Sequence, residues 1–379
     1  MKLFFAFMVL SLGTSVNSIA QDDADVQWFE TLFIIPKNKS LDEERRLADI
    51  KRMGAIETQD KRAEAKALIE LGILHLTRIK DYEQALGWLI RSLTIEDSLS
   101  LHHEKIFTFL AMARVFEEVG DFNKSIGFLN EAKALDAKEE NFNIRSLVLN
   151  ESGRVNAAYG KVDEAYKNYQ LVLEYSRNLE LHSREADALF HLGQLSANRK
   201  KYNEALKTHK EALAIRRDLH DKSKEAISLN EIGVLYLLMN NYERSLANHV
   251  AALEIRQNLK DESALAESYL NIGALYIAKK DFKRAISNLD LALKAGQEAQ
   301  DQEKNFKTYE YLSQCYKQLK DFKKALETKE ASLVALDFIQ GEKNERQLLE
   351  TQNRYLMNKK EAEIDQLETT NALREKEIE

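Results

Sequence analysis

The residues of this sequence that could perform chemistry are eight histidines and a single cysteine. His102, His103 and Glu104 form the one local group of metal-ligating residues. Neighbouring residues on a helix point in different directions and no fourth ligand stands nearby, so we predict no metal site there. The chain also lacks a glycine-rich phosphate loop. We therefore expect no cofactor, no metal and no catalytic constellation; an enzymatic output could only lie beyond Glu379.

The chain repeats itself every 40 residues, which is its most informative feature. One column of the repeat is aromatic or aliphatic, and it comprises Tyr82, Phe122, Val162, Tyr202, Tyr242, Phe282 and Phe322. Small residues stand three places after each of these. A second column of small residues stands nine places before them: Ala113, Gly153, Gly193, Gly233, Gly273 and Ser313, with Gly72 one place out of register in the first copy. Small residues at two fixed positions let two helices approach closely, so each copy is predicted to be a tightly packed pair.

Each copy is predicted to form two amphipathic helices, because its apolar residues recur three and four places apart. One proline and 13 glycines are few for 379 residues, which favours long helices and argues against a sheet architecture. An Asp or Asn precedes the aromatic column in most copies, and such a residue can cap a helix: Asp81, Asp121, Asn241, Asp281 and Asp321.

The repeat also explains the residues with reactive side chains. His209 and His249 occupy the same repeat position, so we predict that they are packing residues. Cys315 shares its position with aliphatic residues such as Leu235 and Leu275, which predicts a small buried hydrophobe. A basic cluster between Arg199 and Arg217 could hold an acidic peptide or form a solvated helix face.

The pattern resembles the tetratricopeptide repeat family. The residues that carry the resemblance include Ile232, Gly233, Tyr236, Tyr242, Ser245 and Ala252. The copies are longer than the common 34 residues and resemble the long-repeat type. The resemblance implies an all-α superhelical solenoid of about seven helix-turn-helix repeats over residues 66–338, with a concave groove lined by the first helix of each repeat.

The resemblance further implies that a protein or peptide ligand binds in this groove. The candidate groove residues are Arg114, Asn150, Arg154, Gln194, Asn230 and Asn271. An asparagine side chain offers both a donor and an acceptor, so it can bind the backbone of a peptide. The alternative is that these residues only bond the neighbouring repeat.

The N-terminal end is predicted to carry an export signal. Lys2 precedes an apolar run from Leu3 to Leu12, and Ser18 and Ala20 suit a signal peptidase, which predicts a signal peptide over residues 1–20. A retained N-terminal anchor is the alternative. We therefore expect a periplasmic protein, or the periplasmic part of an inner-membrane protein. Residues 21–65 are predicted to form a helical cap on the terminal repeat, with docking onto a partner as the alternative.

The C-terminal end and the overall charge complete the predictions. Residues 339–379 are rich in Glu and Lys and carry a broken apolar stripe, which predicts a long helix or a coiled coil that forms a homodimer. The formal net charge of -7 argues against nucleic acid as a partner. The layout resembles the exported half of Bacteroidetes tetratricopeptide sensor histidine kinases and regulators, in which a membrane span, absent from this chain, would follow. A free-standing periplasmic scaffold or assembly factor is the second interpretation.

Overall fold

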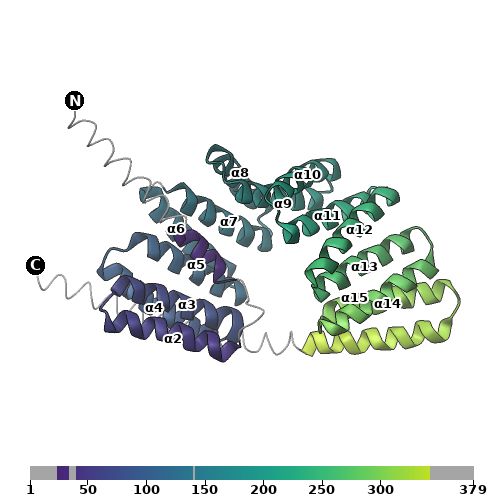
Figure 1. The fold of residues 1–379 in the computed structure, drawn as a ribbon, viewed down its shortest axis with the longest axis horizontal. Helices are drawn as coiled ribbons and strands as arrows, with labels where there is room; N and C mark the ends of the chain where they lie inside the picture. The colour runs from purple at the N-terminus through teal and green to yellow at the C-terminus, as the bar shows by residue number, and fades with distance from the viewer. Residues whose placement is uncertain (1–23, 34–39, 140, 342–379) are drawn as a thin grey trace, which may run out of the picture. The chain divides into compact units, whose positions relative to one another are not determined.

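The structure is a computed structural model, and it describes residues 24–33, 40–139 and 141–341. All regular structure in these ranges is helical, with no strand among them, which confirms the predicted all-α class (Figure 1). The chain divides into two compact units whose boundary falls between Leu171 and Val172. We call the described residues before this boundary unit 1 and those after it unit 2.

Unit 1 consists of a short helix over residues 24–31 followed by an unbroken series of helices. These are α2 (Leu41–Glu57), α3 (Lys61–Leu74), η1 (His75–Ile79), α4 (Tyr82–Ser98), α5 (His102–Glu118), α6 (Phe122–Glu139), α7 (Phe142–Ala158) and the first part of α8 (Val162–Asn178). Helices adjacent in sequence pack against one another, as α3 does against α4 and α5 against α6. The unit therefore grows by stacking antiparallel hairpins.

Unit 2 continues with the same type of hairpin. After the second part of α8 come α9 (His182–Asn198), α10 (Tyr202–Asp218), α11 (Lys222–Leu238), α12 (Tyr242–Leu259), α13 (Glu262–Ala278), α14 (Phe282–Glu298), α15 (Gln302–Gln318) and a helix over residues 322–341. The odd-numbered helices from α3 to α15 are the first helices of the repeats, and the even-numbered helices from α4 to α14, with the helix over residues 322–341, are the second helices. The second helices α4, α6, α10, α12 and α14 each pack on their own first helix and on the first helix that follows, as α12 does on α11 and α13.

The predicted capping residues hold the starts of the second helices. The side chain of Asp81 accepts a hydrogen bond from the backbone N–H of Gln84, and Asn241 and Asp281 do the same three residues ahead. Asp121 and Asp321 follow the same rule at 3.1 and 3.2 Å. A helix start leaves backbone N–H groups without partners, so these acceptors stabilise it. The prediction from the sequence is confirmed.

The glycine column marks where the two helices of a repeat touch. A Cβ atom at Gly233 would lie 2.7 Å from the His249 ring, and one at Gly273 would lie 2.7 Å from Leu289. Real Cβ atoms do not come so close, so only glycine permits this approach. The predicted reason for the small column is thereby confirmed.

The first repeat carries one residue more than the others, and a π-helical turn absorbs it. Gly72 packs on Leu89, 17 residues later, whereas Gly193, Gly233 and the other glycines pack on the residue 16 places later. The extra residue lies in η1, where the N–H of Asp81 donates to the carbonyl of His75, six residues back. A π-turn widens the helix by one residue per turn and so restores the register of the following helix.

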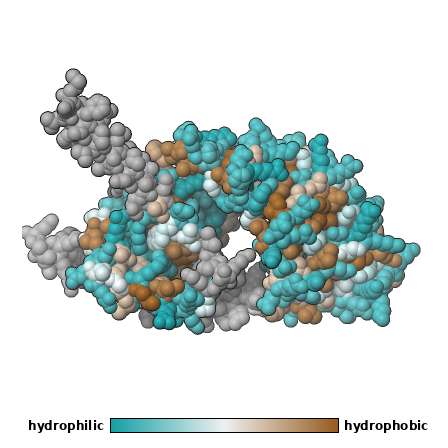
Figure 2. Space-filling view, in the orientation of Figure 1, coloured by the Kyte–Doolittle hydropathy of each residue, from teal (hydrophilic) through white to brown (hydrophobic). Residues whose placement is uncertain are grey.

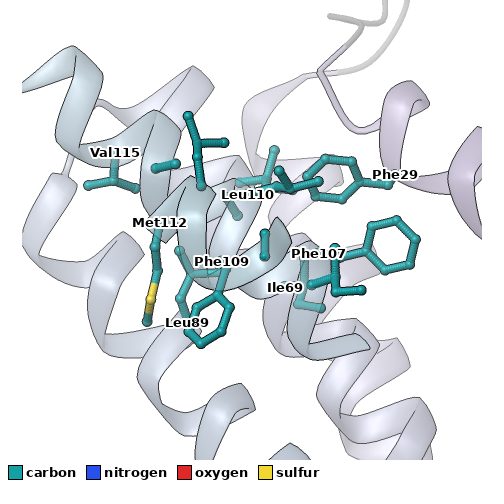
Figure 3. Packing of buried hydrophobic residues seen from close by; sticks show 14 of the residues in the cluster. Phe29, Ile69, Leu89, Phe107, Phe109, Leu110, Met112 and Val115 are labelled. Atoms are coloured by element: carbon teal, nitrogen blue, oxygen red, sulfur yellow. The ribbon is translucent and has the colours of Figure 1, made fainter. Parts of the chain in front are cut away.

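The buried core of unit 1 is continuous from the short N-terminal helix to α7. Phe29 lies among Ile69, Phe107 and Leu110 in this core (Figure 3). The predicted signal peptide over 1–20 and nearly all of the predicted C-terminal helix over 339–379 lie outside the described residues. Within the described ranges, no helix combines the length and apolar character needed to cross a membrane.

Candidate functional site

The first helices of successive repeats lie against one another, and each keeps one side open. Contacts join α3 to α5, α11 to α13 and α13 to α15. In α11, Gly233 faces α12, so by the 3.6-residue period the opposite side carries Ile227, Glu231, Val234 and Leu238. Ile227 is 39% exposed and Leu238 is 52% exposed. We call these four repeat positions, on every first helix, the first-helix face.

In unit 2, the candidate asparagines bond one another across neighbouring repeats. Asn271 Nδ2 donates to Asn230 Oδ1 at 2.9 Å, and Asn230 Nδ2 donates to Glu267 at 3.2 Å. His249 Nδ1 lies 3.1 Å from Asn230 Oδ1. Asn230 is buried beneath the face, whereas Asn271 is half-buried on it. The structure therefore brings these two candidates together and uses both to join α11 to α13.

This part of the face carries two carboxylates, Glu231 and Glu267. Burial raises the pKa of Glu231, the nearby charge of Glu267 adds to the effect, and Arg256 opposes it. Glu267 accepts a hydrogen bond from Arg256 at 3.0 Å. The face of α11 and α13 thus combines two carboxylates, the amide of Asn271 and the exposed apolar Ile227. Such a surface suits a ligand that brings hydrogen-bond donors beside apolar groups.

Gln194 lies one repeat earlier on the same face. Its Oε1 atom is 3.1 Å from His191 Nδ1, within α9. Asp187, also on the face of α9, binds Arg216 at 2.9 Å and Lys224 at 2.8 Å. These ion pairs therefore tie this part of the face to α10 of its own hairpin and to α11 of the following one.

In unit 1, the candidate arginines belong to a buried ion network. Arg114 binds Glu151 through two nitrogens at 2.6 and 2.9 Å, and Arg154 binds Glu151 at 2.9 Å and Glu117 at 2.6 Å. Burial alone would raise the pKa of Glu151, but the charges of Arg114 and Arg154 lower it to about 2. The network holds α5 to α7 and leaves both guanidinium groups engaged.

Asn150 lies on α7, at the repeat position that Asn230 occupies in unit 2. Its Oδ1 atom is buried and has no hydrogen-bond partner among the described residues. A buried carbonyl oxygen without a partner is costly, so this atom is an available acceptor within unit 1.

The helix over residues 24–31 covers the first-helix face of α3 and α5. Trp28 Nε1 donates to Glu70 at 2.9 Å, and Asp25 accepts from Lys66. The rings of Phe29 and Phe107 lie 5.1 Å apart, and Figure 3 shows them side by side. Beyond the helix end, Phe33 lies 3.4 Å beneath the guanidinium of Arg114. Candidate Arg114 is therefore covered by the chain itself. Within the predicted cap, α2 packs on α3 instead.

The residues with reactive side chains are buried packing residues. His209 and His249 face Gly193 and Gly233, which confirms the prediction, and burial lowers the pKa of each to about 4. Cys315 is buried, and burial raises the pKa of its thiol to about 11, which leaves it a poor nucleophile. In the described part of the chain, no group of three His, Cys, Asp or Glu side chains is arranged to hold a metal ion.

Two features of the site escaped the sequence analysis. The reciprocal spacing of 37 residues between Arg114 and Glu151, and again between Glu117 and Arg154, is visible in the sequence and could have indicated the ion network. The position of residues 24–33 could not be found in this way, because that segment lies outside the repeat.

Comparison with known proteins supports the same architecture. The tetratricopeptide repeat family model matches residues 184–258 and 224–298. A search of curated proteins gives no match. Among solved structures, the apo form of RapI is 12% identical, with 91% of this chain and 98% of that chain covered and a TM-score of 0.62.

Two further solved structures have similar folds. A Signal Transduction ATPase with Numerous Domains with a tetratricopeptide repeat sensor, from Pyrococcus horikoshii, is 17% identical, with 88% of this chain and 54% of that chain covered and a TM-score of 0.63. The Cut9–Hcn1 hetero-tetramer of the APC/C is 15% identical, with 72% of this chain and 46% of that chain covered and a TM-score of 0.52. At these identities the likeness concerns the fold alone. The tetratricopeptide repeat family match covers residues 184–298, and with its stacked hairpins and glycine column the chain has the fold of a tetratricopeptide repeat solenoid.

Proposed function

We propose that this protein is an extracytoplasmic protein-interaction scaffold or sensory input module, and that it binds its protein partner on the first-helix face of unit 2. The observation that carries the proposal is the open face of α11, where Ile227 and Leu238 are 39% and 52% exposed beside the carboxyl of Glu231. Figure 2 shows hydrophobic patches on the visible surface of unit 2 amid a mostly hydrophilic exterior. Apolar groups beside a few polar ones are what a protein partner recognises.

The hydrogen bonds among Asn230, Asn271 and Glu267 support the same face as a binding surface. Asn230, Asn271 and Glu267 lock α11 to α13 through their hydrogen bonds, so the face is held in one geometry before a partner arrives. A surface that is already ordered loses little entropy on binding. In this proposal Asn271 and Gln194 contact the partner at the edge, whereas Asn230 positions the helices beneath it.

The test compares capture by two matched double variants. Envelope proteins are captured on the purified chain, on Ile227→Asp/Leu238→Asp, and on the control Leu219→Asp/Leu259→Asp. The control leucines are each 43% exposed but lie at the ends of second helices, away from the face. We expect the face variant to lose at least about tenfold of the captured partner, corresponding to about 1.4 kcal/mol, and the control to lose none. Equal capture by both variants would exclude this face.

The location and the sensory role need their own measurements. Cell fractionation with a tagged chain should recover the protein in the periplasmic or membrane fraction; a cytoplasmic protein would remove the extracytoplasmic part of the proposal. Sequencing the native reading frame beyond Glu379 separates a sensor from a free-standing scaffold. A membrane span followed by kinase or regulator motifs supports the sensor, and a stop codon supports the scaffold.

A further inference from the structure

Residues 24–33 contact the rest of unit 1 in the way that a bound ligand would. Val26 and Phe29 are buried completely against the first helices, while Asp25 and Trp28 make polar contacts at the edge. Lys66 also lies 5.3 Å from the centre of the Trp28 ring. Fully buried aromatic anchors surrounded by polar contacts are typical of the strongest points in protein interfaces.

The contacted positions are the same ones that stay open in unit 2. Phe107 and Arg114, which Phe29 and Phe33 contact, correspond three repeats later to Ile227 and Val234. Once the extra residue of η1 is allowed for, Glu70, the partner of Trp28, corresponds to Glu231. The short helix therefore occupies the first-helix face itself, and not the exposed end of the terminal repeat.

The chemistry of the segment is simple. An acid, Asp25, is followed by aromatic residues three, four and eight places later, namely Trp28, Phe29 and Phe33. Trp28 and Phe29 share one side of the helix with Asp25, and Phe33 follows two residues beyond the helix end. The receiving face complements them, with Lys66 opposite the acid and the ring of Phe107 opposite the aromatic residues.

We propose that the first-helix face of α3 and α5 is a binding site for an amphipathic helix of a partner protein, with an acidic residue followed by aromatic residues three, four and eight places later. Residues 24–33 fill this site in cis, and the partner binds by displacing them. This goes beyond the proposed function, which concerns unit 2. A short tether gives the cis segment an effective concentration of roughly millimolar, so a partner must bind tightly or arrive when the segment is loosened.

The experiment uses the full chain and a fluorescent peptide with the sequence of residues 23–33. The cis segment is loosened by Trp28→Ala/Phe33→Ala, which leaves α3 and α5 unaltered. Fluorescence polarisation should show binding at least about tenfold tighter to this variant than to the unaltered chain. Adding Lys66→Glu to the loosened chain should weaken binding about tenfold, and a peptide with Asp25→Lys should restore it. The control Lys294→Glu reverses an exposed charge in unit 2 and should change nothing.

Two results would overturn the proposal. One is a loosened chain that keeps its helical circular dichroism but does not bind the peptide at about 1 mM. The other is binding that is indifferent to Lys66→Glu. Should the loosened chain unfold, hydrogen exchange on the unaltered chain decides instead: an exchangeable segment requires the amides of residues 25–31 to exchange at least about a hundredfold faster than those of α5. Equal rates would make the segment a permanent part of the core. Loss of capture on the unit 2 face leaves these outcomes unaffected.

Discussion

Unit 1 and unit 2 use the same helical hairpin but place opposite charges at one buried position of their second helices. Unit 1 has Glu96 and Asp136 there, and unit 2 has Arg216 and Arg256, at positions related by multiples of 40 residues, all nearly fully buried. In three of the four cases the partner is a hydroxyl twelve residues later. Thr108 donates to Glu96 at 2.7 Å, whereas Arg256 donates to Ser268 at 2.8 Å.

This difference shows what the repeat demands of its sequence. A hydroxyl both donates and accepts, so the same Ser or Thr position serves a carboxylate or a guanidinium. Asp136, which has Val148 twelve residues later, binds Arg145 at 2.8 Å instead. In these four copies the position therefore accepts either charge, whereas Ser176 and Gly296 occupy it in two others.

The first-helix faces of the two units also differ in how far they are covered. In unit 1 the face is covered by residues 24–33 and sealed by the network around Glu151, which is 5% exposed. In unit 2 the ion-paired carboxylate of the face, Glu267, is 38% exposed and binds Arg256. The central carboxylate of the unit 1 network is thus buried, whereas Glu267 of unit 2 remains accessible to solvent.

The largest effect should come from removing the central carboxylate of unit 1. Glu151→Ala removes a carboxylate that is 5% exposed and leaves Arg114 and Arg154, 23% and 37% exposed, without their shared partner, which should lower the free energy of unfolding by about 2–4 kcal/mol. Glu267→Ala, in solvent contact, should lower it by about 1–2 kcal/mol. Urea unfolding followed by circular dichroism measures both. Equal losses of unfolding free energy would contradict the difference in burial between Glu151 and Glu267.

Glu96 in unit 1 and His249 in unit 2 should respond to pH in opposite directions. Burial raises the pKa of Glu96 to about 7, so its contribution to stability is complete below about pH 4.5 and is lost as the pH rises through 7. Burial lowers the pKa of His249 to about 4, so its contribution is present above about pH 6.5 and is lost as the pH falls through 4. Each group should contribute up to about 3 kcal/mol.

Variants without these groups separate the two effects. Relative to the unaltered chain, Glu96→Gln should gain stability between pH 4.5 and 7, and His249→Leu should gain stability between pH 6.5 and 4. Urea midpoints at four pH values are sufficient. A stability difference that is flat with pH for either variant would contradict the corresponding assignment.

Glycine substitutions should distinguish contact positions from open ones. Gly233→Ala puts a Cβ 2.7 Å from the His249 ring and should cost about 1–3 kcal/mol. Gly87 lies within α4 with nothing within 4 Å of its would-be Cβ, so Gly87→Ala should stabilise by about 0.5–1 kcal/mol. Thermal unfolding compares the two. A stabilising Gly233→Ala would refute the close approach of α11 and α12.

The smallest effect concerns helix starts. Lys201 precedes α10 and makes no capping hydrogen bond, whereas Asp81 caps α4. Lys201→Asp should therefore stabilise unit 2, and Asp81→Ala should destabilise unit 1, each by about 1 kcal/mol. Shifts in the thermal midpoint of opposite sign are expected. The same sign for both changes would show that capping does not control these starts.

Much of the local structure could be predicted from the sequence because it depends on neighbours in the chain. The capping Asp281 acts three residues ahead, and Gly273 meets Leu289 within one hairpin. A periodic sequence repeats such short-range relations, so one copy informs on the others. The partners of the candidate residues were harder to predict, since those of Arg114 and Asn230 lie 37 residues away on the next first helix.

By itself, the sequence determined an all-helical chain of stacked hairpins, their capping residues and the packing roles of His209, His249 and Cys315. Only the tertiary structure decided which polar side chains face solvent and which bond the next repeat. It also decided that residues 24–33 lie on the face of α3 and α5. The reason is physical: helix formation and hairpin packing follow from period and residue size along the chain, whereas long-range pairing depends on which groups are desolvated together when the helices stack.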